Sequence, residues 1–227
     1  MDKNRLEAFS DGVMSIIITI MVLEFKMPKD TSWESLWQIW PVFISYALSF
    51  FFVGLNWSSH HHLFHLASKV NNKILWANLL GLFCLSFTPF ATAWMGENAF
   101  KSTTVTFYAI VLTLSVISYL ILVHQLRSLH GYDSKFSKAF KGYFKIYLTI
   151  ALNLSAAFIA FIGLPKVAFI LLFLISLMWF IPNHRLRAIT QQIHKTPSVY
   201  QEIVIQTHIC NNGMHISNLY NNHLKNT

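Results

Sequence analysis

Long apolar blocks, separated by short polar segments, repeat along most of the chain. The apolar positions are continuous within each block and do not alternate as they do in the strands of a membrane barrel. A block of about twenty apolar residues is long enough to cross a bilayer as a helix. We therefore predict an all-α membrane protein with six transmembrane helices per subunit, at residues 5–25, 36–58, 74–95, 105–126, 143–162 and 167–181.

Composition agrees with this fold class and indicates how the chain is divided into domains. The 227 residues are 54% hydrophobic and only 11% charged, whereas a soluble domain carries about 25% charged residues. No linker-like segment divides the apolar blocks, so we predict one six-helix transmembrane domain at residues 1–182. Residues 183–227 are polar and rich in Asn and His. They are predicted to form a cytoplasmic tail that is partly disordered.

The basic residues predict the orientation in the membrane. With the N-terminus inside and six spans, thirteen of the seventeen Lys and Arg residues fall on the cytoplasmic side, as the positive-inside rule requires. Both termini are then cytoplasmic, in a multi-pass protein of the cell membrane. The net charge of +8 is explained by topology and contact with anionic lipid. It does not indicate nucleic-acid binding.

The first predicted helix carries a stripe of apolar side chains. At 100° per residue, Ile16, Ile20 and Leu23 fall on one side at the spacing i, i+4, i+7, with Gly12 and Thr19 beside them. Branched apolar residues on a membrane helix usually face lipid or other helices. Spacing alone therefore does not predict a pore.

An aspartate near the start of the same helix needs a partner. A carboxylate at the centre of a membrane helix costs roughly 2.5–3.5 kcal/mol, and Asp11 lies close to the end, where the cost is lower. Arg5 is six residues away, about 120° around the helix, so it is a poor partner. Trp57, His60 and His61 end the second span at a similar depth and are predicted donors. A structural role for Asp11 and a direct role in ion passage both remain open from the residues alone.

The histidine run in "LNWSSHHHLFHL" also allows a metal site. His61 and His65 are spaced i, i+4, which allows two imidazoles to share an ion. The run has no HExxH motif and no accompanying carboxylate cluster, so we predict hydrogen bonding and no metal site. In the third span, Pro89 is predicted to kink the helix.

Several motifs together resemble a known family. R-x-x-x-F-S-D-G-V begins at Arg5 and T-x-x-V-L-E begins at Thr19, while W-x-x-H-H-x-x-F begins at Trp57. With Asn78 and the Pro-Phe pair at Pro89, they resemble the lysosomal potassium channel family, transmembrane protein 175, and its bacterial homologues. The likeness covers residues 5 to about 95. The tail of about forty-five residues after the sixth span departs from the bacterial pattern.

The resemblance implies a homotetramer of single-repeat, six-helix subunits whose first helices line the pore. It implies that Ile16, Ile20 and Leu23 form the pore constriction, with Thr19 as a polar layer. It also implies that Asp11 belongs to a structural network that locks the pore helix to its neighbours. The members of this network are Arg5, Phe9, Ser10, Asp11, Trp57, His60, His61 and Asn78.

The predicted function is a potassium-selective, or weakly selective monovalent cation, channel with a hydrophobic constriction and no TVGYG filter. It needs no cofactor other than the permeant potassium ion, no small-molecule substrate and no partner beyond its own copies and the bilayer. A secondary transporter or proton-coupled cation antiporter is the alternative, but such proteins favour repeats and charges at the midplane. An intramembrane enzyme would need a paired catalytic constellation, so we predict that the protein is not an enzyme.

Overall fold

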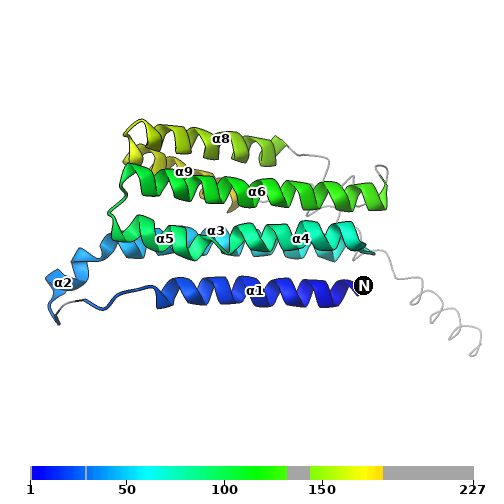
Figure 1. Ribbon diagram of the computed structural model, residues 1–227, viewed down its shortest axis with the longest axis horizontal. Coiled ribbons are helices and arrows are strands. Elements are labelled where there is room, and N and C mark those ends of the chain that lie inside the picture. Colours follow the sequence, from blue (N-terminus) through cyan, green and yellow to red (C-terminus); the bar gives the residue numbers. More distant parts are fainter. Residues whose placement is uncertain (1, 29, 132–143, 181–227) are drawn as a thin grey trace, which may run out of the picture. The chain divides into compact units, whose positions relative to one another are not determined.

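A computed structural model describes residues 2–28, 30–131 and 144–180 (Figure 1). The predicted tail at 183–227 lies outside these residues. The described part is helical throughout, and its elements are α1 (Lys3–Leu23), α2 (Trp33–Gln38), α3 (Trp40–Leu66), α4 (Asn72–Leu85), α5 (Thr88–Glu97), α6 (Ser102–His130), α8 (Phe144–Phe161) and α9 (Pro165–Phe180).

Five helical segments are long and apolar enough to cross a membrane. They are α1, α3, the pair α4–α5 taken together, α6 and α8. The last apolar segment, Pro165–Trp179, is a shorter helix. The protein is therefore an all-helical, multi-pass membrane protein, and the sixth span remains a prediction.

The second predicted span begins and ends too early in the sequence. Residues 36–38 belong to α2, whose N-cap is Ser32. Helix α3 begins at Trp40, with Pro41 in its first turn, where a fixed φ and a missing N–H are tolerated. It then continues through the histidine run to Leu66. The exposed apolar side chains of α2 and the start of α3 are Trp33, Leu36, Trp37 and Trp40.

The helix of the third predicted span is interrupted just before Pro89, the position of the predicted kink. Helix α4 ends at Leu85 and α5 begins at Thr88. Pro89 lies in the first turn of α5, where a residue without an N–H is tolerated. The two short helices follow one another along the same direction in Figure 1.

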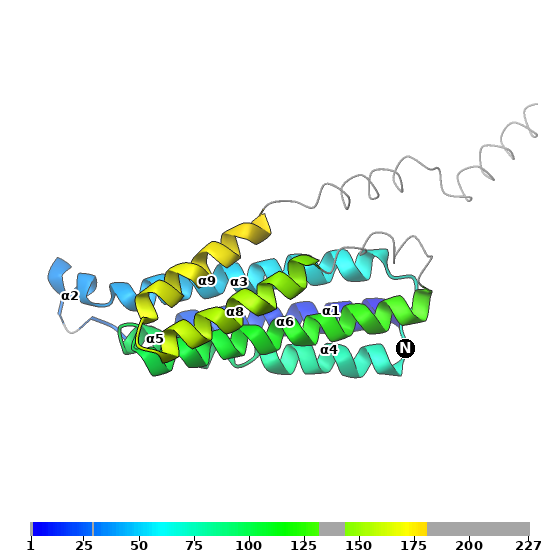
Figure 2. The ribbon, with the colours of Figure 1, turned by 90° about the horizontal axis from the view of Figure 1, so that it is seen from above.

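Helix α1 packs along α3, α4 and α5, while α6 contacts α4, α5, α8 and α9. Figure 1 shows α1 at one side of this set and α8 and α9 at the other, and Figure 2, seen from above, shows α1 between α3 and α4, behind the helices nearer the viewer. Helices α3 and α5 approach closely at Gly96, where an added Cβ would lie 2.8 Å from the Cα of Val42. The set of α3, α4 and α5 thus separates α1 from α8 and α9.

Candidate pore helix and its anchoring contacts

Helix α1 has two contrasting faces. One is buried against α3, α4 and α5 and consists of Leu6, Ser10, Met14, Ile17 and Met21. The side chains of the predicted constriction lie about 110° around the helix from the centre of this face: Ile16 is 57% exposed, Ile20 39% and Leu23 80%. The helix is therefore held along one side only in the single chain.

A chain of buried hydrogen bonds fixes the inner face. The Asn78 amide Nδ2 donates to Ser10 Oγ at 2.8 Å, and Ser10 Oγ donates to the Leu6 carbonyl at 2.9 Å. His60 Nε2 lies 2.8 Å from Asn78 Oδ1. Because Oδ1 accepts, the proton of this bond is on Nε2. Three of the predicted network residues, one each from α1, α3 and α4, are thus joined.

A second set of contacts joins α1 to α3, which run in opposite directions, at successive turns of the two helices. Trp57 Nε1 donates to Asp11 Oδ1 at 2.9 Å, and His61 Nδ1 lies 3.1 Å from Glu7 Oε1. One turn further along, Lys3 Nζ donates to the backbone carbonyl of residue 64 at 3.2 Å. These contacts recur because residues three or four apart share one face of each helix.

The donors predicted for Asp11 are therefore only partly correct. Trp57 bonds to Asp11, but His60 faces Asn78 and His61 faces Glu7. His60 is one position before His61, about 100° around the helix, and this places it toward α4. Sequence reasoning missed Glu7, although its i, i+4 spacing from Asp11 matches that of Trp57 and His61.

Two members of the predicted network lie apart from these bonds. Arg5 and Phe9 are exposed, and among the described residues no hydrogen bond or ion pair joins Arg5 to Asp11. The His61 and His65 rings stack with centroids 6.2 Å apart. The assignment of the histidine run to hydrogen bonding in preference to metal binding remains a prediction.

The exposed face of α1 borders a groove of about 630 Å³ shared with α5. Ile16 and Ile20 line one side, and Phe90 and Trp94 line the other. Charged residues border one end of the groove: Glu24, together with Lys26 and Glu97, which form an ion pair at 2.7 Å. A large apolar groove on a membrane helix is available to another helix or to lipid.

Thr19 is exposed beside this stripe. Its hydroxyl donates to the Ile16 carbonyl at 2.9 Å. The proton is therefore directed at the backbone, and the lone pairs of Oγ1 are free to accept. Such an oxygen is a suitable neutral ligand for a cation that has lost part of its water.

Long apolar helices, held together by buried polar contacts at one end of α1, define a multi-pass helical membrane protein. A profile of the family described as "Endosomal/lysosomal potassium channel TMEM175" matches residues 5–89. A potassium channel of Chryseobacterium sp. (strain P1-3) is 46% identical over 186 residues, which cover 82% of this chain and 96% of that protein. The chain therefore belongs to the TMEM175 family, whose members compared here are ion channels and not enzymes.

More distant relatives agree with this membership. A solved structure, that of a lysosomal potassium-selective channel TMEM175 homolog from Chamaesiphon minutus, has a TM-score of 0.68 at 26% identity. It covers 79% of this chain and 96% of its own. The endosomal/lysosomal proton channel TMEM175 of Homo sapiens is 34% identical over 103 residues, which are 40% of this chain and 20% of that protein.

Proposed function

We propose that four copies of this chain assemble around one axis as a potassium-selective, or weakly selective monovalent cation, channel. Helix α1 of each copy lines the pore, and Ile16, Ile20 and Leu23 form stacked constricting rings. The observation that carries this assignment is the division of α1 into two faces, with the inner one fixed on α3–α5 and the outer one exposed. Relatives named as potassium channels support the ion.

The apolar rings act by excluding water. Four copies of one helix around an axis leave a narrow lumen, and a narrow apolar segment gates by dewetting. When the ring widens, a partly dehydrated cation passes, and potassium loses its water more readily than sodium. The outward lone pairs of Thr19 stabilise such an ion. The sequence contains no TVGYG segment, so a filter made of that loop's carbonyls is not part of the mechanism.

Both termini are assigned to the cytoplasm and the protein to the cell membrane. This follows from the excess of Lys and Arg in the segments before α1, between α3 and α4, and after α6. The contacts of Asp11 and Asn78 then lie at the cytoplasmic end of the pore helix. Their role is to hold α1 in register while its other face borders the lumen.

One feature favours the alternative of a secondary transporter. The α4–α5 interruption is a broken membrane helix, as transporters often have at their binding sites. The interruption consists of Ser86 and Phe87, however, and neither carries a charge. The Ser86 hydroxyl already donates to the Phe83 carbonyl at 2.7 Å. A channel is therefore the better assignment.

Purified protein in a planar bilayer under opposed potassium and sodium gradients tests the proposal. We expect unitary currents whose reversal potential lies toward the potassium equilibrium potential. Saturating flux that requires a counter-transported ion, without unitary currents, would show a transporter. Mass measurement of the detergent-solubilised assembly checks the four copies separately.

A further inference from the structure

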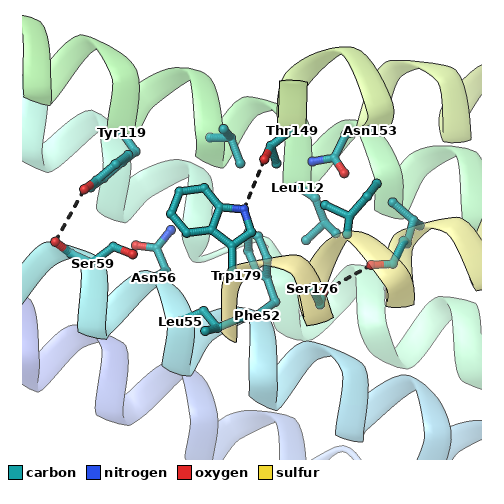
Figure 3. Close-up of a pocket in the computed structure, with 13 residues that line it drawn as sticks. Phe52, Leu55, Asn56, Ser59, Leu112, Tyr119, Thr149, Asn153, Ser176 and Trp179 are labelled. Atoms are coloured by element: carbon teal, nitrogen blue, oxygen red, sulfur yellow. Dashed lines mark hydrogen bonds between the residues drawn. The ribbon is translucent and has the colours of Figure 1, made fainter. Parts of the chain in front are cut away.

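Helices α3, α6, α8 and α9 line a small, partly open cavity whose walls are mostly apolar but carry a few polar side chains. Figure 3 shows the lining side chains, with the Asn153 amide among them. The cavity has a volume of about 50 Å³. A cavity of about 10–15 Å³ is enough for one water molecule, so this space can hold a few waters.

Asn153 supplies an unpaired acceptor to this cavity. The residue is only 2% exposed, and its Oδ1 has no hydrogen-bond partner among the described residues. The neighbouring Thr149 Oγ1 already makes two hydrogen bonds: it donates to the Lys145 carbonyl at 2.8 Å and accepts from Trp179 Nε1 at 3.0 Å. An amide oxygen buried without a partner costs free energy, and a donor in the cavity removes that cost.

A second, smaller cavity repeats the same arrangement between α3, α4 and α6. It measures about 20 Å³ and is lined in part by His60 and Asn78. His60 is 3% exposed, and its Nδ1 has no partner in the described part of the chain. Its Nε2 carries the proton bonded to Asn78, so Nδ1 of the neutral ring is an acceptor that needs a donor.

Asn56 and Tyr119 line both cavities and therefore stand between the two acceptors. The Tyr119 hydroxyl donates to the Ser59 carbonyl at 3.4 Å, which leaves its oxygen able to accept. Asn56 offers both a donor and an acceptor. A small molecule that both donates and accepts hydrogen bonds meets polar groups on each side, as ordered internal water does.

We propose that the two cavities are binding sites for ordered water, one at Asn153 and one at His60, bridged by Asn56 and Tyr119. The water at Asn153 ties α8 to α3. The water at His60 completes the hydrogen bonds of the ring that holds Asn78 and, through it, Ser10 of α1. The sites lie within one subunit, apart from the exposed face of α1, and do not depend on the proposed pore.

X-ray hydroxyl-radical footprinting of the full chain in lipid nanodiscs tests these sites, because radicals form from water held next to a side chain. Leu112 lines the cavity at Asn153, and Leu48, equally buried, lines neither cavity and is the matched control. Leu122 is also buried, lines the cavity at His60 and is compared with the same control. We expect Leu112 and Leu122 to be oxidised several-fold faster than Leu48.

Asn153→Leu keeps the size of the side chain and removes its acceptor. We expect oxidation of Leu112 in this variant to fall to the level of Leu48, and Ser155→Ala, an exposed change on the same helix, to leave it unchanged. Equal oxidation of Leu112 and Leu48 in the unmodified chain overturns the proposal and needs no variant. Persistent oxidation of Leu112 in Asn153→Leu overturns the assignment of the water to Asn153.

Discussion

Trp57 Nε1 donates a hydrogen bond to Asp11 Oδ1 at 2.9 Å, and this contact joins α3 to the first helix at its N-terminal end. Trp57 is 44% exposed, so the indole N–H is not deeply buried. Asp11 lies about 140° around α1 from Ile16. The carboxylate therefore faces a neighbouring helix of its own chain, away from the stripe assigned to the pore.

We expect Asp11→Ala to lower thermal stability and the yield of the proposed tetramer without changing ion selectivity. The unpaired indole costs about 1 kcal/mol, at the low end for a lost partner because it is half-exposed. Size-exclusion chromatography with a thermal ramp measures the loss, and Asp11→Asn, which keeps an acceptor, should recover most of it. A stable Asp11→Ala tetramer with altered selectivity would place the carboxylate in the permeation path.

Asn78→Ala should destabilise the protein more than Asp11→Ala. Asn78 is 2% exposed, and its loss leaves both Ser10 and His60 without the partner they have now. Each buried group left unpaired costs about 1–3 kcal/mol. Melting temperatures of the two variants, measured under identical detergent conditions, show which of them is less stable. Equal losses would mean that the buried chain of hydrogen bonds adds little.

Gly96→Ala should separate α3 from α5. A Cβ at this position meets the Cα of Val42 at 2.8 Å, and backbone cannot rotate away as a side chain does. Overpacking of this kind costs about 1–3 kcal/mol. Gly81→Ala is the control, since its Cβ meets only the Ser118 hydroxyl at an ordinary 3.6 Å. Melting temperatures that fall equally in both variants would contradict the close approach.

The exposed Trp33 and Trp37 should lie in the interfacial region of the bilayer. They are 82% and 76% exposed, and Trp is enriched at membrane–water interfaces because its ring is amphipathic. Lipids brominated near the headgroup should quench less fluorescence in a Trp33→Phe, Trp37→Phe double variant than in the unmodified chain. Trp94→Phe is the control on α5. An unchanged depth profile in the double variant would place these rings away from lipid.

How much could be predicted from the sequence differs between the fold and the site. Block length and continuity were sufficient for α1, α6 and α8, because membrane spans are set by length and hydropathy. They failed at α2, where Trp and Leu in a short separate helix cannot be told from the start of a span. They also failed at the end of α3, because the apolar block gives way to histidines although the helix continues to Leu66.

Which residues belong to the network was easier to predict from the sequence than which of them bond to one another. The motif residues Ser10, His60 and Asn78 do form a connected group, yet the sequence could not show that His60 turns toward α4. That choice depends on a rotation of about 100° per residue and on which helix packs beside α3. Glu7 was missed because no motif contained it, although its spacing from Asp11 places it on the same face.

Ile16→Asn and Ile20→Asn should raise single-channel conductance and reduce the preference for potassium over sodium. An amide hydrogen-bonds water where isoleucine cannot, so the ring stays wet. Both side chains are substantially exposed in the single chain, whereas Ile17 is only 3% exposed. Ile17→Asn therefore buries an amide among Met14, Met21 and Val53 and should lower assembly yield, leaving the selectivity of the assembled fraction unchanged. Reversal potentials and unitary currents in planar bilayers measure the effect. Currents altered by Ile17→Asn and indifferent to Ile16→Asn and Ile20→Asn would show that another face of α1, or another helix, lines the pore.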